Sequence, residues 1–361
     1  MSRDSETDVV IIGAGPIGIE TAVGLKEAGV EYVHFEAGQI AQTIYNWPPD
    51  TRFLSSPEWI TIAGFPIQTP VQDILFGEQY LAYLRSIVEF FDLDVRTYER
   101  VVAVERLDAG FLVTTERRGE RFTTRAEKIV FATGDMVRPN SLGIAGEHLP
   151  HVSHRLEDPH KFFRTRHVVI GGKNSALEAA VRSWRNGANV TICYRRDRID
   201  PKRVFSRLYL DVKILLDKGL IEFRGNTVPT EITPTVVRVA GPAGAEDLAA
   251  EFVTICTGYR ADLSLLAGLG VATVGRDRKP VLDPATNETS VPGVYVVGTA
   301  TGGDQSSYRV FIGTSHGHVR NVVRAVSGGF EPRWGDVPTK RFAITTDDLD
   351  AGSHTGERTE S

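Results

Sequence analysis

The sequence contains little sulfur, since only two of its 361 residues are cysteine, Cys193 and Cys256, and only two are methionine. Two cysteines so far apart form neither a disulfide framework nor the CxxC pair that is used in thiol redox centres and zinc sites. Both lie in apolar runs, where a free cysteine is usually a buried and inert side chain. We therefore predict no metal site and no reactive thiol.

Long hydrophobic runs and an excess of one charge are also absent. No apolar stretch approaches the roughly 20 residues of a membrane-spanning helix, and the polar first eight residues do not resemble a signal sequence. The chain has 41 Lys and Arg against 46 Asp and Glu, a net charge of -5, so nothing attracts it generally to nucleic acid or to an anionic membrane. We expect a cytoplasmic protein that binds small molecules, with neither nucleic acid nor a membrane as a partner.

Glycine, in contrast, is frequent, with 35 residues, and its first cluster follows a strand-like apolar run at residues 8–12. The cluster is Gly13-Ala-Gly15-Pro16-Ile-Gly18, and a helical pattern continues to residue 28. Gly13 permits a tight turn, Gly15 lets a pyrophosphate approach the backbone, and Gly18 lets the helix pack on the strand.

The next strand, residues 32–35, ends at Glu36. A carboxylate at this place accepts hydrogen bonds from both adenosine ribose hydroxyls and repels a 2′-phosphate. The unit therefore predicts FAD or NAD, and not NADP. The alternative is a glycine-rich turn that binds no ligand.

The same order of elements returns about 155 residues later. A strand at 166–170 leads into a second glycine turn, a helix runs to residue 186, and another strand covers 189–194. An internal repeat of this unit predicts two dinucleotides. The residues expected at the second turn are Gly171, Gly172, Lys173, Asn174, Ser175 and Ala176.

This second unit ends in Arg195 and Arg196, where the first ends in an acid. Two guanidinium groups favour a 2′-phosphate through charge-assisted hydrogen bonds, so the site is expected to prefer NADPH. The alternative is a solvated basic strand end. Lys173 stands in place of the middle glycine, where it either contacts the pyrophosphate or hinders its approach.

Three further glycine turns follow strands, and together they organise the chain. They contain Thr133-Gly134, Thr257-Gly258 and Gly298-Thr299, and a helical pattern covers 315–326. The fold class predicted is α/β with two Rossmann-like domains, the NADPH domain (156–286) being inserted into a discontinuous FAD domain (1–155 and 287–330). Residues 331–361 lose periodicity and are expected to be a flexible tail.

The glycine motifs together resemble those of thioredoxin-reductase-like flavoproteins over about residues 8–327. Three segments, FLSSPEWITIAGFP, VSHRLEDPHKF and VVIGGKNSALEAA, are more narrowly similar to the YpdA-type bacillithiol-disulfide reductase family. The resemblance implies FAD in the first domain, NADPH in the second, hydride transfer from nicotinamide to flavin, and electrons passed on to an acceptor. It also suggests a homo-oligomer.

The resemblance assigns roles to individual positions. The glycine motif and Glu36 would hold the ADP half of FAD, and Gly134 would mark the chain crossing. The helix that opens at His316 would point its amino terminus at the pyrimidine edge of the flavin and stabilise the reduced anion. The remaining positions assigned to FAD are Gln42, Thr43, Asn46, Trp47, Val101, Thr133, Gly298 and Thr299, and Trp47 and Phe53 are candidates to stack on the ring.

Three departures concern the reaction with the acceptor. Thioredoxin reductases carry a CxxC between their two nucleotide units, and this chain has none, which excludes direct dithiol chemistry. The bacillithiol-type family commonly has a cysteine at the position of Ile17. Thr299 replaces an aspartate of many relatives, although a hydroxyl still hydrogen-bonds a ribitol.

Histidines remain as candidate proton donors, because imidazole titrates near neutral pH. His151, His154 and His160 flank the expected domain junction, and His316 is the preferred catalytic candidate because of its place beside the flavin. For each of them a capping or solvated role is the alternative.

The function expected is an NADPH-dependent, FAD-containing oxidoreductase that reduces a low-molecular-weight disulfide without a protein thiol. Alternatives among enzymes are a flavin monooxygenase and an NADPH-quinone or ferredoxin-type reductase. An alternative of another class is a redox sensor that binds FAD without turnover.

Overall fold

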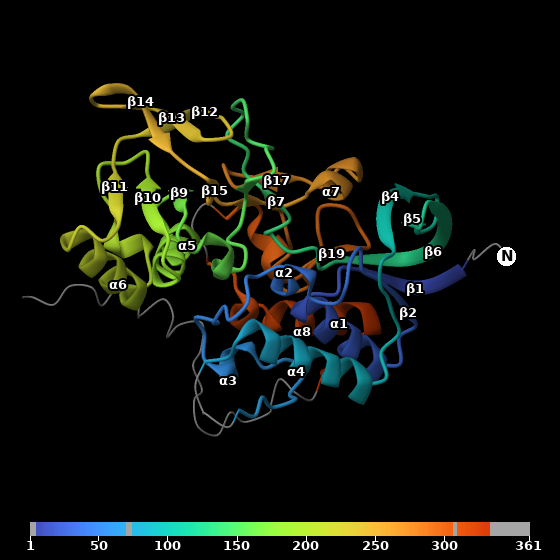
Figure 1. The fold of residues 1–361 in the computed structure, drawn as a ribbon. Coiled ribbons are helices and arrows are strands. Elements are labelled where there is room, and N and C mark those ends of the chain that lie inside the picture. The colour runs from blue at the N-terminus through green and yellow to red at the C-terminus, as the bar shows by residue number, and fades with distance from the viewer. Residues whose placement is uncertain (1–4, 70–73, 306–308, 333–361) are drawn as a thin grey trace, which may run out of the picture. The chain divides into compact units, whose positions relative to one another are not determined.

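The computed structural model describes residues 5–69, 74–305 and 309–332 (Figure 1). Its contacts divide the chain into two compact units. The first unit comprises the described parts of Met1–Tyr45, Arg52–Val137 and Arg260–Ser361, and the second comprises Asn46–Thr51 and Arg138–Tyr259.

The first unit is built on a seven-stranded sheet of order β3-β2-β1-β6-β5-β4, in which β19 also pairs with β6. Parallel pairing joins β1 to β2 and β6, β2 to β3, and β19 to β6, whereas β4 and β5 form an antiparallel meander with β6. The strands are β1 (Ser5–Ile12), β2 (Tyr32–Phe35), β3 (Val95–Arg96), β4 (Arg100–Arg106), β5 (Phe111–Arg117), β6 (Glu120–Phe131) and β19 (Val294–Val296).

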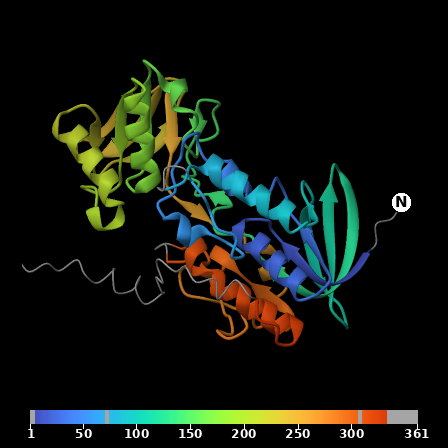
Figure 2. The same cartoon turned by 90° about the horizontal axis from the view of Figure 1, so that it is seen from below.

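Both faces of this sheet are covered, which explains why the last four residues of β1, Val9 to Ile12, are all apolar and buried. Val10 and Ile12 join a buried cluster with Val104 and Phe111 of the meander, and Val9 and Ile11 point to the opposite face. Helix α1 (Pro16–Glu27) packs against β1, and α8 (His316–Ser327) lies beside α1 (Figure 2).

The first unit also contains several shorter elements besides the amphipathic helix α4 (Gly77–Phe90). These are α2 (Gln42–Tyr45), α3 (Pro57–Ile60), α7 (Ser264–Gly268), the strands β17 (Thr273–Val274) and β18 (Lys279–Pro280), and the 3-10 turns η3 (Gly298–Gly302) and η4 (Ile312–Thr314).

The second unit repeats this design around a five-stranded parallel sheet of order β11-β10-β9-β15-β8. Neighbouring residues of β9 face opposite sides, because Val169 packs with the helices α5 and α6 while Val168 packs with the antiparallel sheet β12-β13-β14. The elements are β8 (Val152–Ser153), β9 (Arg166–Ile170), α5 (Asn174–Arg185), β10 (Asn189–Cys193), α6 (Ser206–Asp217), β11 (Glu222–Arg224), β12 (Val228–Ile232), β13 (Val236–Gly241), β14 (Gly244–Ala249) and β15 (Phe252–Ile255), with the turns η1 (Pro159–Phe162) and η2 (Pro201–Arg203).

The α/β fold class with two repeated units is confirmed, and the borders found by contacts differ from those expected. Residues 138–155 belong to the second unit because β8 pairs with β15 in its sheet. Residues 260–286 belong to the first unit because Ala261, Leu263 and Leu266 join its core. The short strands β7 (Arg138–Pro139) and β16 (Tyr259–Arg260) lie at the two borders, and the expected tail lies outside the described residues from 333 onward.

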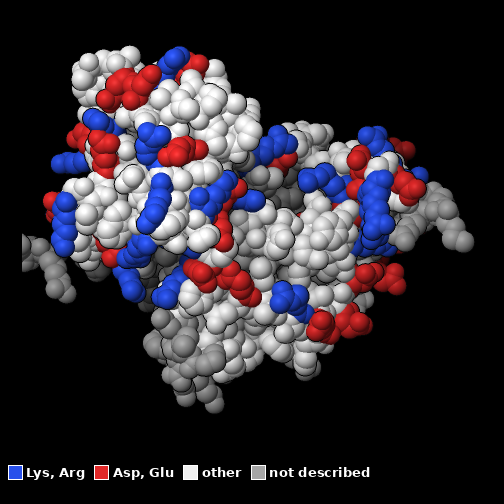
Figure 3. Space-filling view, in the orientation of Figure 1, with Lys and Arg blue, Asp and Glu red and all other residues white. Residues whose placement is uncertain are grey.

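Charges of both signs are interspersed over the face drawn in Figure 3, as the small net charge suggests. Within the described ranges, no helix is long and apolar enough to span a membrane.

A buried histidine lies in the sheet of the second unit. Both ring nitrogens of His167 bond hydroxyls, Nδ1 to Ser183 Oγ at 2.9 Å and Nε2 to Thr254 Oγ1 at 2.8 Å, and the ring stacks on Phe162 at 4.1 Å. Burial, with a smaller effect from Lys161, lowers the pKa of His167 to about 3. The imidazole is therefore neutral in the folded protein.

This histidine should make the protein sensitive to acid. Because its folded pKa lies below the ordinary 6.5, its contribution to stability is complete above pH 6.5 and is lost as the pH falls toward about 3. In urea unfolding measured between pH 6.5 and 4, His167→Gln should reduce the slope of stability against pH by up to about 1.4 kcal/mol per pH unit. The exposed His160→Gln should leave the slope unchanged, and an unaltered slope in His167→Gln would contradict the assignment.

Candidate functional site

The first glycine turn joins β1 to α1 at the carboxyl edge of the sheet. Gly13 has φ +102, and a Cβ there would lie 2.6 Å from the Ala132 carbonyl oxygen. A Cβ on Gly18 would collide with the Gly13 carbonyl oxygen, whereas a Cβ on Gly15 would meet nothing within 4 Å. Two glycines thus allow the turn to close, and the third leaves open space where a phosphate can approach the backbone. Pro16 begins α1, where its missing N–H costs no helical bond.

Two side chains from β2 and its end support this turn. Glu36 is buried, and its carboxylate accepts hydrogen bonds from Ala14 N and Gly38 N, both at 2.8 Å. His34, which sequence analysis missed, lies behind the turn with Nε2 2.9 Å from the Gly13 carbonyl oxygen. Burial lowers the pKa of His34 to about 4, so the ring is neutral and Nε2 donates to that carbonyl.

The ends of β6 and β19 bring four of the expected positions to the same edge. Gly134 has φ +73, and a Cβ there would lie 3.7 Å from Thr299 Oγ1. Gly298 lies against Ile17 at the start of α1, 3.3 Å from its Cβ by the same criterion. Thr133 Oγ1 is buried and has no hydrogen-bond partner among the described residues, as expected of a hydroxyl whose partner is a ligand.

A buried carboxylate at this edge was not anticipated. Asp135 follows Gly134 and accepts hydrogen bonds from the Thr299 hydroxyl and from Gln305 Nε2, the latter at 2.8 Å. Burial raises the pKa of Asp135 despite these donors. The Thr299 side chain, which stands where relatives have an aspartate, is therefore paired with a carboxylate from another strand end, and no motif in the sequence announces this pairing.

The other positions assigned to FAD lie in several different parts of the structure. The segment with Gln42 and Thr43 begins beside the glycine turn, because Ala41 N donates to Ala14 O at 2.8 Å. Val101 is buried on β4 and pairs with Thr115. Asn46 and Trp47 lie in the short segment Asn46–Thr51, which belongs to the second compact unit. Phe53 is buried and packs on Tyr80, with ring centroids 4.7 Å apart, so it is a core residue.

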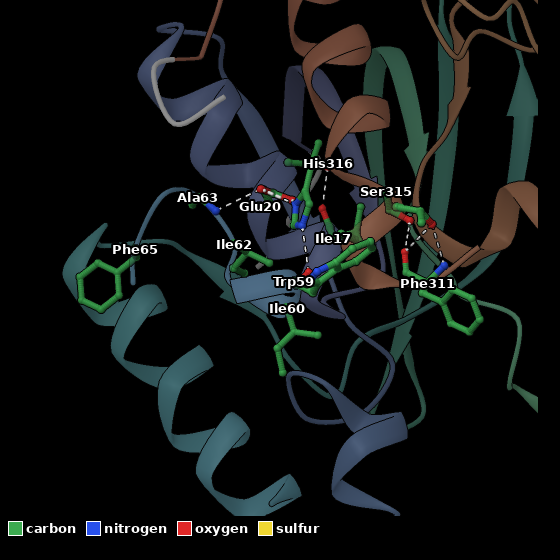
Figure 4. A network of polar contacts seen from close by, with 12 residues as sticks. Ile17, Glu20, Trp59, Ile60, Ile62, Ala63, Phe65, Phe311, Ser315 and His316 are labelled. Atoms are coloured by element: carbon green, nitrogen blue, oxygen red, sulfur yellow. Dashed lines mark hydrogen bonds and ion pairs between the residues drawn. The ribbon is translucent and has the colours of Figure 1, made fainter. Parts of the chain in front are cut away.

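A buried ion pair joins α1 to the start of α8 (Figure 4). Nδ1 of His316 lies 2.8 and 3.0 Å from the two carboxylate oxygens of Glu20, and its Nε2 lies 3.4 Å from the Trp59 carbonyl oxygen. Burial alone would lower the pKa of His316, but the Glu20 carboxylate and the hydrogen bonds to Glu20 and Trp59 raise it above its ordinary value. Sequence analysis selected His316 and missed its partner, because an acid inside an apolar helix carries no spacing signal.

The second glycine turn joins β9 to α5. Gly171 has φ +144, where a side chain would be strained, and a Cβ on Gly172 would meet the Tyr194 ring at 2.6 Å. Asn174 Oδ1 accepts a hydrogen bond from Phe205 N at 2.8 Å, and Ala176 packs against Gly171. The turn is therefore closed as in the first unit, with Ser175 in the first turn of α5.

Basic side chains gather beside this turn. Lys173 precedes α5 and has a lowered pKa, through burial first and then through the charges of Arg203, Arg196 and Arg195. Both arginines of the predicted pair are exposed. The structure thus brings the two predicted arginines together with Lys173 and adds Arg203, a combination that suits a polyanionic ligand.

The turn after β15 is fixed to the entry of the second unit. Thr257 Oγ1 donates to the Asn140 carbonyl at 2.9 Å, and Asn140 N donates to the Gly258 carbonyl at 2.9 Å. Gly258 has φ +98 and so requires the conformation that glycine favours.

The three remaining candidate histidines have other surroundings. His151 Nε2 bonds the Thr233 carbonyl oxygen at 3.1 Å, and His154 Nε2 lies 3.6 Å from the buried Glu147 carboxylate. His160 is exposed in η1. None of these contacts involves a glycine turn.

Neither cysteine is disulfide-bonded, and burial raises the thiol pKa of both Cys193 and Cys256 to about 12. A thiol with that pKa carries almost no thiolate near neutral pH, so neither is a nucleophile. Within the described parts of the chain, no three metal-ligating side chains form a group that could hold a metal ion.

Comparison with known protein families identifies the family of this chain. The family model described as pyridine nucleotide-disulphide oxidoreductase matches residues 10–298. The chain belongs to this family. It is therefore an oxidoreductase of the NAD(P)H-dependent flavoprotein type, acting on an electron acceptor.

Individual members of the pyridine nucleotide-disulphide oxidoreductase family align over most of the chain. The bacilliredoxin reductase Bdr of Bacillus subtilis is 32% identical over 324 residues, covering 88% of this chain and 97% of that protein. A ferredoxin–NADP reductase of Ignicoccus hospitalis is 28% identical and covers 86% of this chain and 95% of its own. The solved bacillithiol disulfide reductase Bdr (YpdA) of Bacillus cereus superposes with a TM-score of 0.86 at 30% identity, covering 90% and 99% of the two chains.

Gly18→Ala tests the closure of the first turn. The added methyl group would collide with the Gly13 carbonyl, and forced packing of this kind typically costs about 1–3 kcal/mol. We expect a lower free energy of unfolding in urea and a lower flavin-to-protein absorbance ratio. Gly268→Ala in α7, where a Cβ meets nothing within 4 Å, is the matched control. Wild-type stability and flavin content in Gly18→Ala would refute the role of this contact.

The inert state of the thiols is tested by titration with a chromogenic disulfide. At pH 8 the native protein should react far more slowly than the urea-unfolded protein, because both thiols have a pKa of about 12. Cys193→Ser and Cys256→Ser should each remove one of the two thiols counted after unfolding. Rapid reaction of either cysteine in the native protein would contradict the account.

Proposed function

We propose that this protein is an FAD-containing oxidoreductase that uses NADPH to reduce a low-molecular-weight disulfide of the bacillithiol-disulfide type, without a thiol of its own as relay. NADPH would lose two electrons, and the disulfide would gain two electrons and two protons to give two thiols. When bound, FAD supplies the redox chemistry that couples donor and acceptor. The observation that carries the proposal is the pair of glycine turns that end in opposite charges, Glu36 in the first and Arg195-Arg196 in the second.

FAD is the ligand proposed for the first turn. The open space at Gly15, the unpartnered Thr133 hydroxyl and the fixed Glu36 carboxylate fit a dinucleotide with free ribose hydroxyls. The Thr299 and Asp135 pair would face a polyol such as the ribitol, because a hydroxyl and a carboxylate both accept hydrogen bonds from sugar hydroxyls.

NADPH is proposed for the second turn because of the charges around Lys173. Burial and then the charges of three arginines lower the pKa of this lysine, so four cationic groups act on one region. A 2′-phosphate placed there would relieve their mutual repulsion and take bidentate hydrogen bonds. NADH lacks this phosphate and would gain less.

The proposed acceptor is supported by the relatives named as bacilliredoxin and bacillithiol disulfide reductases. This chain has Ile17 at the position where the bacillithiol-type family commonly has a cysteine, and the Ile17 side chain is buried against Gly298. The two cysteines that the chain does contain are inert, because burial raises their thiol pKa. A disulfide would therefore have to be reduced without a protein thiol as an intermediate carrier. The same absence favours a second candidate, a ferredoxin-type reductase, which needs no thiol; the relative from Ignicoccus hospitalis is a ferredoxin–NADP reductase.

Competition between acceptors separates these functions. With NADPH present and oxygen removed, bacillithiol disulfide, oxidised ferredoxin and a soluble quinone should each be offered to the purified protein while NADPH absorbance is followed. We expect the disulfide to give the fastest turnover and two thiols per NADPH. Faster turnover with ferredoxin or quinone would favour that reductase, and hydrogen peroxide formation with oxygen alone would favour a monooxygenase.

The coenzyme preference is tested by Arg195→Gln and Arg196→Gln. Losing a charge-assisted contact to the 2′-phosphate should raise the KM for NADPH about tenfold or more and should change the KM for NADH little. Arg198→Gln is the matched control, since Arg198 is exposed nearby and is not among the charges that act on Lys173. Equal effects on the two coenzymes would exclude a phosphate-binding role.

A further inference from the structure

The strongest unassigned feature is the buried carboxylate of Glu20 on α1. Its side chain is 1% exposed, and it contacts two other segments of the first unit. One oxygen accepts a hydrogen bond from Ala63 N at 3.0 Å, and both oxygens lie within 3.0 Å of His316 Nδ1 (Figure 4). A buried carboxylate is costly unless it is paired, so this arrangement constrains the chain strongly.

The partners of His316 define its protonation. Nδ1 faces a carboxylate and Nε2 faces the Trp59 carbonyl oxygen, and each of these groups only accepts hydrogen bonds. Both ring nitrogens must therefore donate, which makes the ring a cation. Because both protons are already bound to protein acceptors, His316 is poorly suited to donate a proton to a product.

The location of this cation is unusual. His316 is the first residue of α8, and a positive charge at the amino end of a helix opposes the helix dipole. Without Glu20 the dipole, burial and the nearby Arg320 would all favour the neutral ring. The Glu20 carboxylate therefore holds the ring in its protonated form against all three of these effects.

Other charged groups around the pair act in definite directions. On α8, the partly buried His318 has a pKa lowered to about 4, through burial first and then the charge of His316, so it is neutral. On α4, Tyr80 and Tyr83 have raised pKa values, mainly through burial and partly through Glu20, and stay protonated. The cation on His316 is thus balanced by Glu20, and Arg320 is a further positive charge that acts on it.

We propose that Glu20 is a positioning residue of the flavin site, which holds His316 with protons on both ring nitrogens and fixes it, together with the Trp59 segment, at the start of α8. The inference deepens the proposed function and rests on it for the location of the flavin. The fixed cation and the helix dipole together would favour the reduced, negatively charged pyrimidine edge of the flavin. The Trp59 ring packs closely on the turn before α8, because a Cβ added at Gly313 would lie 2.6 Å from it.

The first arm of the test measures His316 itself. Nitrogen-15 histidine NMR of the protein as purified, assigned with His316→Gln, should show both ring nitrogens protonated in the wild type at pH 7, because the Glu20 carboxylate raises the pKa of His316. In Glu20→Gln the ring should be neutral at pH 7. A neutral His316 in the wild type, or an unchanged ring in Glu20→Gln, would overturn the proposal.

The second arm measures the flavin. Glu20→Gln should shift the anaerobic equilibrium between NADPH and bound flavin toward the oxidised flavin about tenfold, which corresponds to a loss of about 1.4 kcal/mol in the relative stability of the reduced flavin. Glu89→Gln, an exposed residue of α4, should leave the equilibrium unchanged. His316→Lys, which keeps the charge, should stay closer to the wild type than His316→Gln. An unchanged equilibrium in Glu20→Gln would refute the electrostatic role.

Three outcomes can be told apart: a variant that does not fold, a proposed function that is wrong, and a role of Glu20 that is wrong. If Glu20→Gln does not fold, Glu20→Gln with His316→Gln removes both buried charges and supplies the neutral comparison. A wild-type protein without flavin would refute the proposed function and the electrostatic role together. The NMR arm would still decide whether Glu20 holds His316.

Discussion

The chain depends first on the close approach of backbone to backbone at the carboxyl edge of the sheet in each unit. A Cβ at Gly13 or Gly18 in the first unit, or at Gly171 in the second, would collide with a carbonyl oxygen of a neighbouring turn or strand end. Only glycine allows strand, turn and helix to meet there, and the amino end of the helix then points N–H groups at the ligand. Every functional assignment in the two units is a consequence of where that edge lies.

Each unit uses the same scaffold and differs in the charges placed on it. A parallel sheet has helices on one face and an antiparallel meander on the other, so the carboxyl-terminal residues of β1 (9–12) and of β9 (168–170) are all apolar. The first turn ends in Glu36, which is tied to the turn by two backbone N–H groups, and the second ends beside Lys173 among three arginines. Under the proposed function, the repeat would let one fold distinguish two nucleotides by the sign of the charge at one corner.

Sequence patterns predicted the repeat because short continuous apolar runs followed by glycines report local backbone geometry. They did not predict the borders of the inserted unit, because β8 and the segment after Tyr259 are assigned by pairing and packing with distant residues. Glu20, Asp135 and His34 were missed for the same reason. Each is a lone polar residue in an apolar stretch, and its partner lies on another element: His316, Thr299 and Gly13, respectively.

The central claim is that two dinucleotides bind, one on each turn, and that electrons pass between them. Its most direct test is anaerobic stopped-flow absorbance of the purified protein mixed with NADPH. The account predicts that one flavin per chain is present and that its absorbance is lost on mixing, as NADPH is consumed in equal amount. A protein that binds no flavin, or that retains an oxidised flavin in the presence of excess NADPH, would contradict it.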